Sequence, residues 1–193
     1  MTSTNPRRFH MTPANPLASC RRTFRLCLLL AILVSGCRQN HHYKWSEYEI
    51  APERVSLGAL PTGTTVTLVN GQANSEEYEL GSIGIHHYHG SLSELTDAVI
   101  HHLSQELERR GAAVRDDAPR TLEIAVVHAD CETGFNLLRV DMKVRAKAGD
   151  GYLVEIPVSN RTPWTVPRGY DGAVALAVIR ILSDSAIAGY LGQ

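Results

Sequence analysis

The stretch that decides the fold is residues 136–158, NLLRVDMKVRAKAGDGYLVEIPV. Apolar residues recur at every second position on both sides of its centre, which is the period of a strand with one buried face. The centre, Gly149-Asp150-Gly151, is too short a turn to connect parallel strands. Residues 121–132 alternate in the same way and join this stretch through Thr133-Gly134. The sequence therefore predicts a three-strand antiparallel meander with one apolar and one charged face.

Two further strand signals precede the meander. Residues 64–70, TTVTLVN, are β-branched and alternating, and they end at the turn signal Asn70-Gly71. Residues 76–85, EEYELGSIGI, predict a weaker strand, because the glycines at 81 and 84 interrupt it.

Two helices are also predicted. Ser91-Leu92-Ser93-Glu94 fits a capping box, and Gly111 ends the apolar pattern that follows it. The apolar positions of this helix are Leu92, Leu95, Val99, Leu103 and Leu107. Residues 169–182, GYDGAVALAVIRIL, predict a second helix with Asp171 as its cap. This second helix is apolar almost all round, so we expect it to be buried against the sheet or against a partner.

These elements predict an α+β fold, with a largely antiparallel sheet of four or five strands and two helices on one face. We expect three segments along the chain: a leader over 1–36, a lipidated cysteine and irregular tether over 37–62, and a single domain over 63–193. The turn signal Leu60-Pro61-Thr62-Gly63 marks the boundary between tether and domain.

The first 36 residues have the composition of a secretory leader. Five arginines and no acidic residue precede the apolar run LCLLLAILV at 26–34, and small residues follow at 35–36. Nine apolar residues are too few to span a bilayer, which requires about 20. Met11 would give a shorter leader than Met1 and would keep the arginines at 21, 22 and 25.

The end of the leader, Val34-Ser35-Gly36-Cys37, resembles the lipobox of bacterial lipoproteins. The resemblance implies that Cys37 becomes the first residue of the mature chain and carries a diacylglycerol on sulfur and an acyl chain on nitrogen. We expect no other cofactor. Each buried methylene contributes about 0.8 kcal/mol, so several acyl chains anchor a protein firmly to a membrane.

Charge and cysteine content limit the possible functions. Removal of the leader takes five of the 19 basic residues and none of the 20 acidic ones, which leaves a net charge of −6. This charge disfavours nucleic acid or an anionic lipid face as the partner. Cys20 and Cys27 leave with the leader, so Cys131 is the only thiol beside Cys37, and an internal disulfide is not expected.

The histidines suggest a metal site. His86 and His89 precede the first helix, and either His102 or His128 could add a third imidazole. The alternative is a polar, partly aromatic loop that packs on the start of the helix. A zinc, copper or nickel titration that depends on His86 and His89 would separate these two interpretations.

Other candidate groups are weaker. Cys131 and His128 could form a thiol nucleophile, but residues three apart on a strand face opposite sides. The acidic pairs at 76–77 and 116–117 lie in polar turns, and the sequence contains no GxSxG or HExxH motif. Trp164 and Tyr170 could be a surface anchor for a partner, or they could pack at the edge of the sheet.

The order of elements resembles the small outer-membrane lipoproteins of the YajG type and a larger set of small bacterial outer-membrane lipoproteins. The resemblance covers about residues 64–191, through segments such as VTLVNGQ, ELERRG and GYDGAVALAVIRIL–DSAIAGYL. It implies a periplasm-facing α+β domain without known catalysis, and it assigns no functional residues.

From these features we expect a membrane-anchored, non-catalytic bacterial lipoprotein, an accessory or assembly component of the cell envelope that presents a protein-binding surface. Arg38 follows Cys37, and resemblance to enterobacterial sorting favours the outer membrane, facing the periplasm. The alternative is a periplasmic metal-binding lipoprotein that uses the segment from His86 to His89.

Overall fold

The computed structural model describes most of the chain after the leader, namely residues 38–51, 54–55, 57–134, 137–163 and 165–193. Cys37 and Trp164 lie outside the described residues. Within the described residues, eight strands form two sheets, and three helices accompany them. The predicted α+β class is therefore confirmed.

The predicted meander is the centre of the larger sheet. Strands β6 (Arg120–Thr133), β7 (Leu138–Ala148) and β8 (Leu153–Thr162) pair antiparallel in that order. Along β7 every second residue is buried, from Leu138 to Ala148, and the residues between them face solvent or are half-buried. The alternation in the sequence therefore corresponds to one face of β7 in the core and one face toward solvent.

Two strands extend this sheet on the other side of β6. Strand β2 (Thr65–Asn70) lies parallel to β6, with Leu68 opposite Leu122. The short β5 (Ala113–Val114) pairs parallel with β2 at the edge and completes the order β5-β2-β6-β7-β8. The helix α2 lies in the connection between β2 and β6, as parallel strands require.

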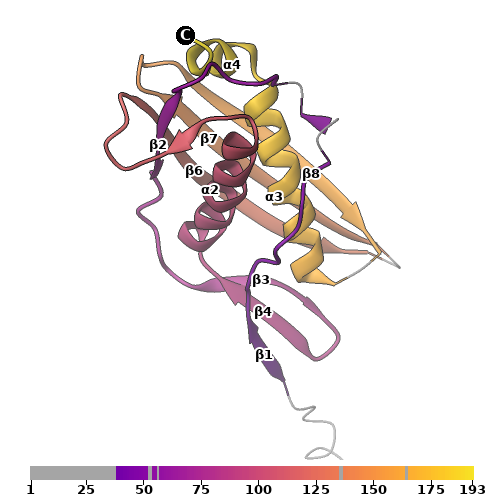
Figure 1. The fold of residues 1–193 in the computed structure, drawn as a ribbon. Helices are drawn as coiled ribbons and strands as arrows, with labels where there is room; N and C mark the ends of the chain where they lie inside the picture. Colours follow the sequence, from indigo (N-terminus) through magenta and orange to yellow (C-terminus); the bar gives the residue numbers. More distant parts are fainter. Residues whose placement is uncertain (1–37, 52–53, 56, 135–136, 164) are drawn as a thin grey trace, which may run out of the picture. The chain divides into compact units, whose positions relative to one another are not determined.

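Both predicted helices cover the apolar face of this sheet (Figure 1). Helix α2 (Leu92–Arg109) has the predicted capping box: the Ser91 side chain accepts from the Glu94 backbone N–H, and the Glu94 side chain accepts from the Ser91 N–H. Helix α3 (Val166–Ser183) is followed by α4 (Ser185–Leu191), which Asp184 caps.

The start of α3 corrects one prediction. Thr165 is the N-cap and a proline occupies the first turn, where its missing N–H costs no hydrogen bond. Asp171 therefore lies inside the helix and is not its cap. Its carboxylate is buried and accepts a hydrogen bond from the Tyr43 hydroxyl, 3.1 Å away.

A second, smaller sheet contains the histidine-rich segment. Strands β3 (Tyr78–Ile83) and β4 (His86–Gly90) form an antiparallel hairpin, and β1 (Gln39–His42) pairs parallel with β4. The segment before α2 is thus a strand, and the loop expected there is wrong. The weak strand predicted over 76–85 corresponds to β3 alone.

The segment expected to be an irregular tether is part of the folded unit. Residues 38–193 form one compact unit, and this unit includes β1. Tyr43, Ile50 and Val55 are buried in the same core as the helices and the larger sheet. The expected boundary at residue 63 therefore does not separate a tether from the domain.

No single helix in the described part of the chain is long and apolar enough to cross a membrane. Helices α3 and α4 would reach that length and composition only as a pair, with a bend of 69° between them.

Candidate functional site

The smaller sheet, β1-β4-β3, carries five histidines, and we call it the histidine sheet. Strand β1 contributes His41 and His42, and β4 contributes the other three at 86, 87 and 89. Gln39 pairs with His86 and His42 pairs with His89. Because side chains alternate along a strand, His41 and His86 share one face, and His42, His87 and His89 share the other.

The first face holds a close pair of imidazoles. His41 Nε2 lies 3.0 Å from His86 Nδ1, so one ring donates a hydrogen bond to the other. The His41 ring also stacks on Tyr88, with ring centroids 5.2 Å apart. The two rings come from the parallel neighbouring strands β1 and β4.

On the second face, His42 lies between two carboxylates. Its Nδ1 is 3.2 Å from Glu77 Oε1, and its Nε2 is 2.7 Å from Glu94 Oε1. The hydrogen bonds to Glu94 and Glu77 raise the pKa of His42 above its ordinary value. Glu94 also closes the capping box of α2, so His42 joins β1 to the start of that helix.

A second ion-paired group lies on the same face. His87 Nδ1 is 3.0 Å from Glu79 Oε1, and Arg38 Nη2 is 2.9 Å from Glu79 Oε2. The hydrogen bond from His87 lowers the pKa of the Glu79 carboxyl, and Arg38 adds to the effect. These contacts connect β3 to β4 and to Arg38, the residue directly before β1.

The predicted metal ligands His86, His89 and His102 are not brought together. His86 and His89 face opposite sides of β4, because an odd spacing reverses the side chain on a strand. His102 lies on α2 and is buried under Tyr48. Within the described residues, no three histidine, cysteine or acidic side chains are grouped as a metal ion would require.

His102 has an unusual environment. It is 1% exposed, its ring stacks on Tyr48 at a centroid distance of 4.0 Å, and neither ring nitrogen has a hydrogen-bond partner in the described residues. Burial lowers the pKa of His102, because it penalises the charged imidazolium. The residue is therefore neutral in the folded protein at neutral pH.

Tyr48 is one of several residues that attach the N-terminal segment to the helices. We call the described residues of 38–57 the arm. The Tyr48 hydroxyl donates to the Asp171 carbonyl at 2.9 Å, and the Tyr43 hydroxyl donates to the Asp171 carboxylate. Burial raises the pKa of both tyrosines, so both hydroxyls stay protonated as donors. The arm is thus fastened to the first turns of α3.

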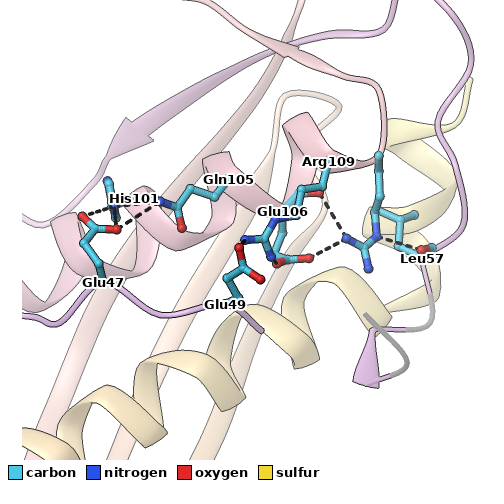
Figure 2. A network of polar contacts seen from close by, with 8 residues as sticks. Glu47, Glu49, Leu57, His101, Gln105, Glu106 and Arg109 are labelled. Atoms are coloured by element: carbon cyan, nitrogen blue, oxygen red, sulfur yellow. Dashed lines mark hydrogen bonds and ion pairs between the residues drawn. The ribbon is translucent and has the colours of Figure 1, made fainter. Parts of the chain in front are cut away.

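The arm is also fastened along α2 by polar contacts (Figure 2). Glu47 pairs with His101 at 3.0 Å and accepts from Gln105 at 3.2 Å. One turn further on, the buried Glu106 carboxylate receives hydrogen bonds from Arg109 at 2.6 Å and Arg110 at 2.5 Å.

The arginines continue these contacts into the arm. Arg110 Nε donates to the Leu57 carbonyl at 2.9 Å, and Arg109 lies 3.4 Å from Glu49 (Figure 2). Together with the contact of His42 with Glu94, the arm therefore contacts α2 from its first turn to its last. From the sequence, with Tyr43 and Tyr48 beside charged residues, a tether packed on its own domain was at least as plausible as one at the lipid headgroups. The individual contacts could not be read from the sequence.

The remaining candidates from the sequence are the thiol of Cys131 with His128, and the aromatic anchor at Tyr170. Cys131 is half-buried, and burial raises the pKa of its thiol to about 11, which disfavours a thiolate nucleophile. His128 is exposed on β6. Tyr170 is fully buried and donates to the Leu80 carbonyl at 3.0 Å, so the surface anchor expected there is wrong. Its packing role follows from this contact.

The comparisons with known proteins support the fold only. The sequence matches no family model and no curated protein. Among solved structures, the fold is similar to the crystal structure of protein XCC0632 from Xanthomonas campestris, which is assigned to the family DUF330. The TM-score is 0.53 at 11% identity, and the match covers 78% of this chain and 96% of that chain.

Proposed function

We propose that this chain is a bacterial lipoprotein of the cell envelope, anchored through lipid on Cys37. The observation that carries the proposal is the position of the lipobox-like Val34-Ser35-Gly36-Cys37 directly before the folded unit, whose first residue is Arg38. A lipidated first residue needs a leader before it and a folded body after it, and the chain changes character at this position.

Within the envelope, the role that we propose is a non-catalytic accessory or assembly component facing the periplasm from the outer membrane. The organisation of the chain, similar to YajG-type lipoproteins, supports this role. The partner surface that we assign is the uncovered face of β6, β7 and β8. Its charges are interleaved in ion pairs, such as Arg145 with Glu155 at 3.0 Å, and a surface of mixed charge lacks the cationic patch that nucleic acid binding needs.

The test is fractionation of bacteria that produce the full chain, with labelled palmitate in the medium. Wild-type protein should take up label and sediment with the membranes. Cys37→Ser should lose the label and enter the soluble fraction, whereas Cys131→Ser, the matched control, should behave as wild type. Label in Cys37→Ser, or wild-type protein without label, would contradict the proposal.

We propose metal binding as a second candidate function, because one contact favours it. The His41 and His86 ring nitrogens, 3.0 Å apart, offer two imidazole ligands. Two ligands are fewer than a protein metal site usually supplies, so water would have to complete the coordination. Calorimetric titration of the membrane-extracted protein with zinc, copper and nickel should show one-to-one binding that His41→Ala and His86→Ala abolish and His128→Ala leaves intact. The absence of any heat of binding, or equal binding by all three variants, would contradict this second proposal.

A further inference from the structure

The chain enters the folded unit beside a hairpin turn. Only Arg38 separates Cys37 from Gln39, the first residue of β1, and two residues span about 7 Å at most. The Gln39 backbone N–H donates to the Ile85 carbonyl at 2.9 Å. The tip of the β3–β4 hairpin therefore lies at the end of the molecule where a lipid on Cys37 would be attached.

The tip of this hairpin is apolar. Ile83 pairs with His86, which leaves the two-residue turn Gly84-Ile85, and Gly84 has the positive φ of 60° that such turns require. Turn positions usually carry glycine, asparagine, aspartate or serine, which water solvates well. Here Ile85 occupies the second position and is 46% exposed.

A second apolar side chain lies at the adjoining hairpin. The Thr133 hydroxyl at the end of β6 donates to the Ser82 carbonyl of β3 at 3.0 Å, which joins the β6–β7 turn to the β3–β4 hairpin. Leu137, in that β6–β7 turn, is 52% exposed and its carbonyl accepts from the Gly134 N–H. Leu153, equally exposed, lies at the opposite end of β7 and β8.

Beside Leu137 there is a cationic group without a counter-ion. An open groove is lined by Glu132, Thr133, Leu137 and two arginines, 139 and 161. Glu132 lies opposite Arg139 and makes no ion pair with Arg161 within the described residues. The arginines are directly opposite one another on β7 and β8, an arrangement that is unfavourable for like charges. Arg139 pairs with Asp141 at 2.9 Å, whereas Arg161 makes no ion pair within the described residues. A phosphate ester would supply the missing anion.

We propose that this end of the molecule lies against the bilayer, with Ile85 and Leu137 at the interface and Arg161 facing lipid phosphates. The inference rests on the lipid anchor of the proposed function. The net charge of −6 disfavours adsorption from solution, but the anchor makes the second contact intramolecular, so two apolar side chains and one arginine are enough to orient the body. The histidine sheet then faces the headgroups, and the opposite end with Leu153 points away.

The test uses the full chain in bacterial membranes, after mass spectrometry has verified the lipid on Cys37. A photo-crosslinking benzophenone amino acid replaces Ile85, Leu137 or, as the matched control, Leu153. Ile85 and Leu137 should give phospholipid adducts at least five-fold more often than Leu153. Equal adduct yields at the three positions would overturn the inference.

A second variant isolates the arginine. Arg161→Glu should reduce the phospholipid adducts formed from position 137 by half or more, whereas Arg115→Glu, also exposed, should leave them unchanged. An unchanged adduct yield in Arg161→Glu would contradict the proposed contact between Arg161 and lipid phosphate. An unmodified Cys37 contradicts the proposed function itself, whereas lipid on Cys37 without adducts at position 85 contradicts only the orientation.

Discussion

His42 is the residue whose charge has the clearest structural role. Because Glu94 and Glu77 raise its pKa above the ordinary value of 6.5, the folded state binds a proton more tightly than the unfolded state does. Its stabilising contribution is therefore complete below pH 6.5 and is lost as the pH rises through the raised pKa. We expect His42→Gln to lower the melting temperature at pH 5.5 and to have little effect at pH 9.

Thermal denaturation at the two pH values measures this difference, with His128→Gln as the control for loss of an exposed histidine. An equal drop in melting temperature at both pH values would show that the His42 contacts do not depend on its charge.

His102 has the opposite dependence on pH. Its folded pKa is lowered by burial, so the stability that depends on its neutral form is present above 6.5 and declines as the pH falls. His102→Phe keeps the ring on Tyr48 and removes two buried nitrogens without partners. We expect this variant to be at least as stable as wild type at pH 8, with a gain of up to about 1 kcal/mol in the free energy of unfolding. At pH 5 its advantage over wild type should be larger. Urea unfolding at both pH values tests this; a loss of stability that is larger at pH 5 would contradict it.

At the scale of elements, the arm is the part whose attachment is best defined. Tyr43→Phe and Asp171→Ala each break the buried hydroxyl–carboxylate contact. Asp171→Ala should cost about 1–3 kcal/mol, because it leaves the Tyr43 hydroxyl buried without an acceptor. The double variant should lose less stability than the sum of the losses in the two single variants, because both remove the same contact. Hydrogen exchange should accelerate in the arm of each variant and stay slow in β7; uniform acceleration would show that the arm does not open separately.

The elements also show what the sequence could predict. The meander and α2 were predictable, because alternation and the capping box at Ser91 are local signals. Strand β1 was not, because four residues pair with a strand more than 40 positions away and their pattern carries no period. The first turn of α3 was missed because proline and Gly169 weaken the helical signal there. The paired histidines and the arm contacts depend on tertiary structure, so spacing alone could not reveal them.

At the scale of the whole molecule, the folded unit begins directly after Cys37, the residue that we propose carries lipid. The compact unit begins at Arg38, and β1 follows one residue later. If Cys37 carries lipid, the histidine sheet is close to the membrane surface and the larger sheet extends from it. The membrane anchor and the orientation that follows from it both depend on the modification of that one sulfur.

Mass spectrometry of the first peptide of the mature protein, purified from bacterial membranes, tests that claim most directly. We predict a peptide that begins at Cys37 and carries a diacylglyceryl group on sulfur and an acyl chain on the α-amino nitrogen. A mature chain that retains residues before Cys37, or a Cys37 with a free thiol, would contradict the account.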